Sequence, residues 1–305
     1  MSGGSSVASR SERVLVTGAR GFTGRYLVDR LRADGYSVVG MTEALPAGAS
    51  EVHANLLDPG AMARAVELAR PDRVVHLAAL SFVAHDDVEA TYRVNLLGSL
   101  ALLQALDAMS TPIRSVILAS SAAVYGNVNA DAIEETAAPA PVSHYGASKR
   151  AMELMAATFR DRLPIVVVRP FNYTGPGQAE HFAVPKVVSH FRRRAEAIDL
   201  GNIDVVREFL DVRNVVEIYR RLLTCPAAIG DTVNVCTGRG VSLREVIAAL
   251  EVETRHHPRI RVDPGLVRAN DAPRVVGSPR KLEALIGGLP EIPLAATLRE
   301  MLASG

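Results

Sequence analysis

A glycine-rich turn directly after a short apolar run is the feature that most constrains how this chain can fold. Residues 13–17, RVLVT, form the apolar run, and glycines follow at positions 18, 21 and 24. The run predicts a buried strand, and residues 22–33 predict a helix that ends before Gly35. A strand, a tight glycine turn and a helix in this order predict a turn whose backbone N–H groups approach the pyrophosphate of a dinucleotide.

The alternation of strands and helices continues along the first half of the chain. The predicted strands cover 36–41, 52–55, 73–78, 115–119 and 165–169, and the predicted helices 59–70, 87–109 and 144–162. The strands are rich in Val and Leu and show little polar alternation, which is typical of parallel strands covered on both faces. We therefore expect an α/β fold, a Rossmann-type doubly wound parallel sheet.

The pattern changes after Pro170, where Pro and Gly become frequent and the segments become shorter and more mixed. This change predicts a smaller α+β region on the carboxyl side of the sheet, where ligands of such sheets bind. The expected division assigns residues 11–172 and part of 205–237 to dinucleotide binding. It assigns 173–204 and 238–305 to substrate binding, and residues 1–10 to a flexible tail.

Composition narrows the partners that the chain can have. The formal net charge is +1, which gives no indication of nucleic acid or an anionic membrane as a partner. No apolar run reaches the ~20 residues that span a bilayer. Cys225 and Cys236 are the only cysteines, which argues against a disulfide framework and a cysteine-built zinc site. We expect a cytoplasmic enzyme without a metal.

The choice between NAD and NADP depends on two residues. Glu43, slightly beyond the second predicted strand, could hold the ribose 2′-hydroxyl of NAD. Arg20, inside the glycine turn, could pair with the 2′-phosphate of NADP. Either side chain could also be merely solvated, and the sequence favours NADP only slightly.

A tyrosine and a lysine four residues apart form the candidate catalytic pair. Tyr145 and Lys149 lie on one face of a predicted helix. A Tyr hydroxyl has a pKa near 10, so acid/base work at neutral pH needs a neighbouring positive charge. Ser121 follows a predicted strand at its carboxyl end, and Asn95 stands in an apolar helical stretch where an amide must be hydrogen-bonded. A purely structural amide is the alternative interpretation of Asn95.

These motifs together resemble the extended short-chain dehydrogenase/reductases, from about residue 13 to residue 302. The resemblance implies that Tyr145 is the general acid/base and that Lys149 lowers its pKa and holds the nicotinamide ribose. It implies that Ser121 binds the reacting sugar oxygen and that Asn95 completes a tetrad. The cofactor-binding residues that it implies are Gly18, Arg20, Gly21, Phe22, Gly24, Asn55, Leu56, Leu77, Ala78, Ala79, Tyr145 and Lys149. The chain departs from the family pattern at Asn55, where an Asp is usual, and in lacking a Trp near its C-terminus.

The residue two positions before Tyr125 bears on the type of reaction. Dehydratases of this family carry a carboxylate there, and this chain has Ala123, whose methyl group cannot act as a base. Residues 169–178, 201–213 and 268–273 are similar to those of GDP-4-keto-6-deoxy-D-mannose reductases. That similarity implies NAD(P)H-dependent reduction at C4, giving GDP-D-rhamnose, GDP-6-deoxy-talose or a heptose analogue. The substrate-binding residues that it implies are Ser81, Ser121, Asn172, Lys186, Arg207 and Arg268.

Other interpretations remain open at this point. A nucleotide-sugar 4-epimerase would use the same tetrad and retain NAD tightly. Arg207 and Arg268 could instead form surface salt bridges, the commoner role of a single Arg. A non-catalytic NAD(P)-sensing protein would keep the glycine turn but often lose the tetrad, which is complete here. The resemblance also implies a homodimer, formed by the helices that hold Asn95 and Tyr145.

Overall fold

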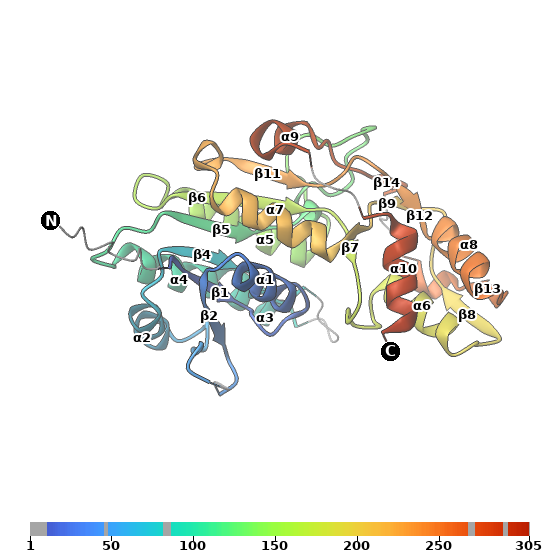
Figure 1. Cartoon of the computed structure of the whole chain (residues 1–305). Helices are drawn as coiled ribbons and strands as arrows, with labels where there is room; N and C mark the ends of the chain where they lie inside the picture. Colours follow the sequence, from blue (N-terminus) through green and yellow to red (C-terminus); the bar gives the residue numbers. More distant parts are fainter. Residues whose placement is uncertain (1–10, 46–47, 82–86, 268–271, 289–291, 305) are drawn as a thin grey trace, which may run out of the picture.

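A central parallel sheet dominates the computed structural model of the chain (Figure 1), which describes residues 11–45, 48–81, 87–267, 272–288 and 292–304. Within these residues the sheet has seven strands, in the order β11-β6-β5-β4-β1-β2-β3. Their bounds are β1 (Arg13–Thr17), β2 (Ser37–Thr42), β3 (Glu51–His53), β4 (Arg73–His76), β5 (Ser115–Ala119), β6 (Ile165–Pro170) and β11 (Thr232–Val235). Every pairing between them is parallel, so the predicted Rossmann-type α/β fold is confirmed.

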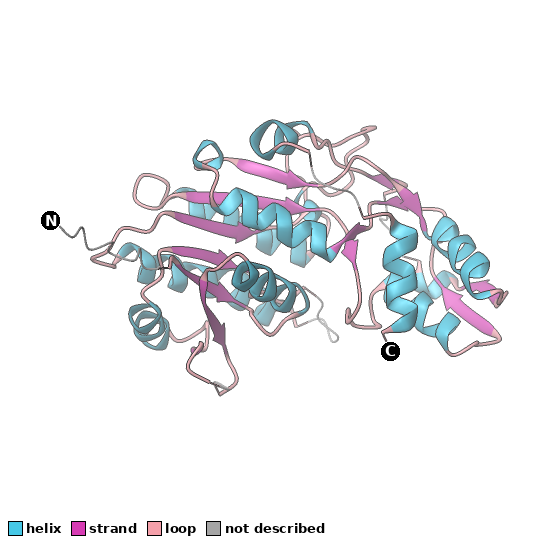
Figure 2. Ribbon diagram, viewed as in Figure 1, coloured by secondary structure: helices cyan, strands magenta, loops and turns pink. Residues whose placement is uncertain are grey.

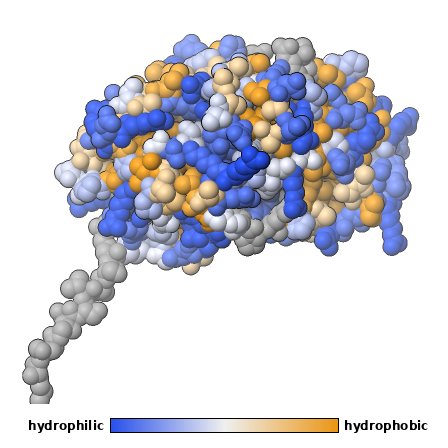
Figure 3. Space-filling view, turned by 90° about the horizontal axis from the view of Figure 1, so that it is seen from above, coloured by the Kyte–Doolittle hydropathy of each residue, from blue (hydrophilic) through white to orange (hydrophobic). Residues whose placement is uncertain are grey.

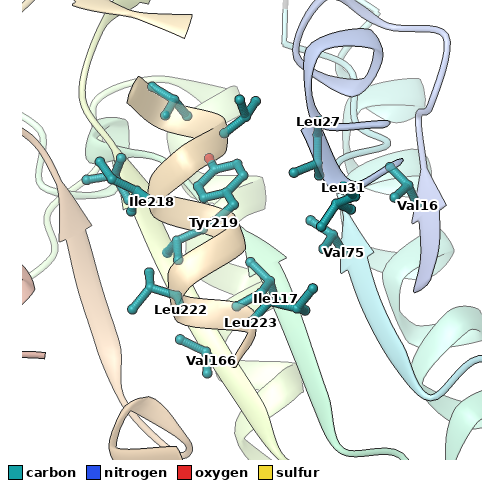
Figure 4. Close-up of a cluster of buried hydrophobic side chains, with 14 of the residues drawn as sticks. Val16, Leu27, Leu31, Val75, Ile117, Val166, Ile218, Tyr219, Leu222 and Leu223 are labelled. Carbon is teal, nitrogen blue, oxygen red and sulfur yellow. The ribbon is translucent and has the colours of Figure 1, made fainter. Parts of the chain in front are cut away.

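Helices cover both faces of the sheet (Figure 2). On one face lie α1 (Phe22–Ala33), α7 (Val212–Leu223) and α9 (Arg280–Ile286); on the other lie α2 (Pro59–Ala69), α4 (Ser99–Asp107) and α5 (His144–Ala157). Alternate strand residues face opposite layers: Ile117 packs under α7, whereas Val116 and Leu118 pack on the other side. Figure 4 shows Tyr219 and Leu222 of α7 directed into the first of these layers. This two-sided burial explains why the strands are apolar without alternation.

The order in which successive strands join the sheet reverses at β1, which pairs with β2 on one side and with β4 on the other. Ligands of open α/β sheets bind at such a switch point, outside the carboxyl ends of the strands. The turn after β1 and the segment after β4 are in close contact there. Their backbones are so near that a Cβ added at Gly18 would lie only 2.9 Å from the backbone nitrogen of Ala78.

The helix expected over 87–109 is interrupted. It consists of α3 (Val88–Tyr92), a π-helical turn η1 (Arg93–Gly98) and α4. The π turn contains Asn95 and ends at Gly98, where an added Cβ would lie 2.9 Å from the Cβ of Leu56. Single π turns in helices are rare and are frequently found at functional sites. The helix expected over 144–162 ends earlier, at Ala157, and the other boundaries differ by at most two residues.

The smaller C-terminal region lies beyond the carboxyl ends of the strands, as the arrowheads in Figure 1 show. Its helices are α6 (Ala183–Arg192), α8 (Leu243–Thr254) and α10 (Leu294–Ala303). Its short strands are β7 (Tyr173–Thr174), β8 (Ala197–Leu200), β9 (Val206–Arg207), β10 (Leu210–Asp211), β12 (Val241–Ser242), β13 (Arg259–Val262) and β14 (Arg274–Val275). The three helices bury a separate apolar cluster that includes Phe191 and Leu250.

On the face shown in Figure 3, hydrophobic side chains stand in separate groups among hydrophilic ones. In the part of the chain that the structure describes, no helix has the length and apolar character needed to cross a membrane.

Candidate active site

The glycine turn is shaped for a close approach of backbone to a ligand. Gly18 has φ +67°, in the left-handed region that favours glycine, and a Cβ at Gly24 would lie 2.1 Å from the carbonyl oxygen of Gly18. Gly21 caps α1 and has no side chain to bond the first N–H groups of that helix. Free N–H groups at a helix N-terminus favour a phosphate. The residues present therefore fit the pyrophosphate of a dinucleotide.

Arg20 is engaged by an acidic residue in this structure. Its Nε and Nη2 donate to the carboxylate of Glu51 at 3.0 and 2.6 Å, and Nη2 also donates to the carbonyl oxygen of Leu45 at 3.1 Å. The pair borders a surface cavity of about 310 Å³ between α1, β2 and β3. Glu43, the alternative contact for the ribose, is exposed in the loop after β2. Arg20 would have to share its guanidinium between Glu51 and a 2′-phosphate.

Helix α5 and the end of β5 bring three of the candidate catalytic side chains together. Ser143 caps α5 by accepting a hydrogen bond from the N–H of Gly146 at 3.1 Å, which starts the helix one residue before Tyr145. Lys149, one turn later, is buried and donates to the carbonyl oxygen of Ala119 at 2.8 Å. Ser121, two residues after Ala119, is hydrogen-bonded to the Tyr145 side chain.

The ionisation of this group is set mainly by burial. Burial raises the pKa of Tyr145 to about 12, reinforced by nearby Tyr173 and opposed by the hydrogen bond to Ser121. Burial lowers the pKa of Lys149 to about 8, opposed by the negative charge of Glu153. At neutral pH Tyr145 is thus a neutral acid beside a charged lysine, a pairing suited to donating a proton.

Asn95 is fully satisfied by polar partners. Its Oδ1 accepts from the N–H of Leu80 at 2.8 Å, and its Nδ2 donates to the carbonyl oxygen of Leu80 at 3.1 Å and to Ser148 Oγ at 3.0 Å. The Ser148 hydroxyl donates in turn to the carbonyl oxygen of Tyr145 at 2.8 Å. The amide of Asn95 thus has the structural role given above as the alternative interpretation. It connects the segment after β4 to the first turn of α5.

A buried ionic cluster supports the end of β5. Glu153 accepts hydrogen bonds from Ser120 Oγ at 2.6 Å and from Nε and Nη2 of Arg169 at 2.8 and 2.7 Å. The side chains of Glu153 and Arg169 are each only 4% exposed, and the guanidinium of Arg169 lies 4.7 Å from the ring centre of Tyr125. The cluster holds the strand end next to Ser121.

Tyr173 lies at the candidate site, although no role is expected for it from the sequence. Its ring stacks on Phe22 with centroids 6.2 Å apart, and its hydroxyl is hydrogen-bonded to Thr23 Oγ1 at 2.8 Å. Tyr173 lies close enough to Tyr145 to raise the pKa of that side chain. The signal that could have found it is its position directly after Asn172, in the same motif.

The expected substrate-binding residues lie in several places. Ser81 and Asn172 are exposed in loops after β4 and β6. Lys186 on α6 donates to the carbonyl oxygen of Asp199 at 2.8 Å, and Arg207 on β9 donates to that of Val206 at 2.8 Å. Arg268 lies outside the described residues. Of the expected cofactor contacts, Leu77, Ala78 and Ala79 follow β4 beside Gly18, and Asn55, exposed, accepts from the N–H of Leu57.

The described residues contain no group of three or more His, Cys, Asp or Glu side chains placed to hold a metal ion. Cys225 and Cys236 are both free thiols, and Cys236 is buried.

The chain is similar to known proteins over most of its length. A model of the NAD dependent epimerase/dehydratase family matches residues 14–236. The GDP-6-deoxy-D-talose 4-dehydrogenase of Aggregatibacter actinomycetemcomitans is 35% identical over 276 residues, 90% of this chain and 91% of that protein. The GDP-6-deoxy-D-mannose reductase of Pseudomonas aeruginosa is 34% identical over 307 residues, 96% of this chain and 97% of that protein.

Solved structures share the fold over almost the whole chain. The structure of a proposed epimerase from Burkholderia cenocepacia J2315 is 44% identical, with a TM-score of 0.90 over 96% of this chain and 97% of that one. The structure of RMD from Pseudomonas aeruginosa complexed with NADPH is 33% identical, with a TM-score of 0.86 over 96% of this chain and 98% of that one.

Proposed function

The chain belongs to the NAD dependent epimerase/dehydratase family of NAD(P)-dependent enzymes, and on this premise we propose that it reduces a GDP-4-keto-6-deoxyhexose at C4. The product would be a GDP-6-deoxyhexose such as GDP-D-rhamnose or GDP-6-deoxy-D-talose. The names of the two relatives support this substrate class, and the name of the second supports reduction.

The reaction adds a hydride to the C4 carbonyl carbon and a proton to its oxygen, and oxidises the nicotinamide. Reduced nicotinamide, when bound, supplies the hydride. Tyr145 donates its phenolic proton to the forming alkoxide, and Ser121 stabilises the developing charge on the same oxygen by a hydrogen bond. The positive charge of Lys149 stabilises the phenolate that Tyr145 becomes.

The observation that carries the proposal is the geometry at the carboxyl end of β5, where the buried ammonium of Lys149 lies one helical turn from Tyr145 and Ser121 lies beside that hydroxyl. Tyr145 is protonated at neutral pH, since burial raises its pKa to about 12, and can donate a proton to a carbonyl oxygen.

The substrate would lie between the sheet and the smaller region. Lys186 and Arg207, on α6 and β9, belong to that region and offer the positive charge that a sugar diphosphate requires. Asn172 follows β6 at the carboxyl edge of the sheet, on the same side as Ser121. We assign these three residues to the diphosphate and the sugar as part of the proposal.

A 4-epimerase is the second candidate, favoured by the likeness to the Burkholderia structure described as a proposed epimerase. An epimerase would retain NAD through purification and interconvert sugars without net consumption of cofactor. A dehydratase has less support, because Ala123 lies in the turn η2 (Ala122–Val124) where a carboxylate would be needed.

The test is to mix the purified protein with NADPH and freshly made GDP-4-keto-6-deoxy-D-mannose. We expect stoichiometric oxidation of NADPH, and NMR of the product then assigns its configuration at C4. Tyr145→Phe is the matched control, because it removes the proton donor and keeps the ring. Conversion without loss of NADPH, by a protein purified with bound NAD, would establish the epimerase instead.

A further inference from the structure

His76 occupies the centre of a buried chain of hydrogen bonds that none of the proposed catalytic roles uses. It is the last residue of β4 and is 1% exposed. Its Nδ1 lies 2.7 Å from Thr17 Oγ1, and its Nε2 lies 2.9 Å from Ser99 Oγ. Thr17 directly precedes the glycine turn, and Ser99 directly follows the π turn that carries Asn95. The imidazole therefore connects the cofactor loop to the helix of the candidate tetrad.

The donors and acceptors in this series of hydrogen bonds determine which ring nitrogen of His76 carries the hydrogen. The Ser99 hydroxyl donates its one hydrogen to the carbonyl oxygen of Asn95 at 2.7 Å, so it must accept from Nε2 of His76. Nδ1 then carries no hydrogen and accepts from the Thr17 hydroxyl. Thr17 Oγ1 also accepts from the N–H of Ala78 at 3.1 Å. Each hydrogen has one acceptor only if His76 is neutral and protonated on Nε2.

The surroundings keep the imidazole neutral. Burial lowers the pKa of His76 to about 3, and the positive charge of Lys149 acts in the same direction. A protonated ring would place a hydrogen on Nδ1 opposite the hydroxyl of Thr17, which would have to turn away. His76 therefore stays neutral over the neutral range of pH, and this series of hydrogen bonds keeps a single arrangement.

The far end of the chain reaches Tyr145. The carbonyl held by Ser99 belongs to Asn95, whose amide donates to Ser148 Oγ at 3.0 Å. The Ser148 hydroxyl donates to the carbonyl oxygen of Tyr145 at 2.8 Å. Unbroken contacts between buried groups thus connect the residue before Gly18 with the helical turn that carries the catalytic hydroxyl.

We propose that His76 is a positioning residue, which sets the catalytic turn of α5 relative to the glycine turn through Thr17 and Ser99. The proposal rests on the proposed function for the step that it serves. Hydride transfer requires the ligand held by one turn to be aligned with the hydroxyl carried by the other, so an error of placement reduces the rate of the chemical step. His76 touches neither reactant and acts only through these neighbours.

The kinetic test compares His76→Phe, which keeps a flat ring, with His76→Gln, which restores a donor near Nε2. We expect His76→Phe to lower kcat about tenfold with KM for NADPH and sugar unchanged within about twofold, and His76→Gln to recover part of kcat. His256→Phe is the control, since His256 also makes an imidazole hydrogen bond, at 2.8 Å to the carbonyl oxygen of Ala195 in the smaller region. A folded His76→Phe enzyme with wild-type kcat would overturn the proposal.

A double-mutant cycle tests whether the two ends act through one chain. Thr17→Val and Ser99→Ala each remove one hydroxyl that contacts His76. If the imidazole transmits their effect, the double variant loses no more kcat than the worse single variant. Losses that multiply would mean two independent structural roles and would contradict the proposal.

Nitrogen NMR of the histidine rings gives a readout that needs no substrate. We expect His76 in the full chain to show the Nε2–H tautomer at neutral pH, with and without NADPH. A signal from the Nδ1–H tautomer or from an imidazolium would overturn the proposal. If wild type does not oxidise NADPH with the sugar, the proposed function fails, while this measurement still decides the state of His76.

Discussion

Lys149 donates a hydrogen bond of 2.8 Å to the carbonyl oxygen of Ala119, at the end of β5. Glu153, one turn further along α5, accepts a hydrogen bond of 2.6 Å from the neighbouring Ser120. Two residues one turn apart on the helix thus hold the last residue of the strand and the residue that follows it, and the next residue is Ser121. This double attachment fixes Ser121 relative to the helix that carries Tyr145.

Replacing Lys149 tests the ionisation of the site. Because burial lowers its pKa to about 8, the ammonium loses its proton as pH rises through about 8, and the reductive rate should fall above that pH. In Lys149→Arg the charge persists, since Arg does not deprotonate in proteins, so a slower enzyme without this basic limb is expected. The pH profile of kcat/KM checks it, and an unchanged basic limb in Lys149→Arg would assign that limb to another group.

Glu153→Gln tests the support beneath the strand end. The substitution leaves the charge of Arg169 buried without its partner, so the free energy of unfolding should fall by about 3–5 kcal/mol. Urea denaturation measures this loss. The control is Asp204→Asn, whose ion pair with Arg244 is exposed, and which should show no measurable change. Equal stability of Glu153→Gln and wild type would show that the buried pair does not stabilise the fold.

Gly24→Ala tests the shape of the glycine turn. The added Cβ would meet the carbonyl oxygen of Gly18 at 2.1 Å, so the turn must shift away from its ligand-binding shape. NADPH affinity, measured by fluorescence titration, should fall by about a hundredfold. Gly288→Ala is the control, since a Cβ there meets nothing within 4 Å. Unchanged affinity in Gly24→Ala would place the dinucleotide elsewhere.

Arg20→Ala tests the choice of cofactor. If Arg20 meets the 2′-phosphate, its loss should weaken NADPH about tenfold and NADH little, because only NADPH carries that charge. Isothermal titration with both cofactors measures the ratio of affinities. Arg162→Ala removes an exposed Arg that pairs with Asp107, away from the glycine turn, and serves as control. Equal losses for both cofactors would give Arg20 no part in the choice.

The strands, the sheet and most helices were predictable because each follows from a local pattern. Apolar runs such as 115–119 and the glycines after Thr17 act within a few residues. The π turn at Asn95 was not predictable, because the apolar spacing of a helix is the same on either side of one inserted residue. What identified Asn95 was the cost of an amide in an apolar stretch.

The polar connections across the fold could not be read from the sequence. The partners of His76 lie 59 and 23 residues away along the chain, and Glu51 lies 31 residues from Arg20. Such contacts depend on the order of strands in the sheet, which places β1 beside β4 and β3 beside β2. The sequence therefore predicts the candidate catalytic residues, and the fold was needed to show what holds them.

The most direct test of the reductase account follows one hydrogen. NADPH deuterated on the transferring face of nicotinamide C4 is mixed with GDP-4-keto-6-deoxy-D-mannose and the wild-type protein, and the sugar is examined by NMR. The account predicts one deuterium at C4 of the product for each NADPH oxidised, and none with Tyr145→Phe. A product formed without deuterium at C4 and without loss of NADPH would contradict it.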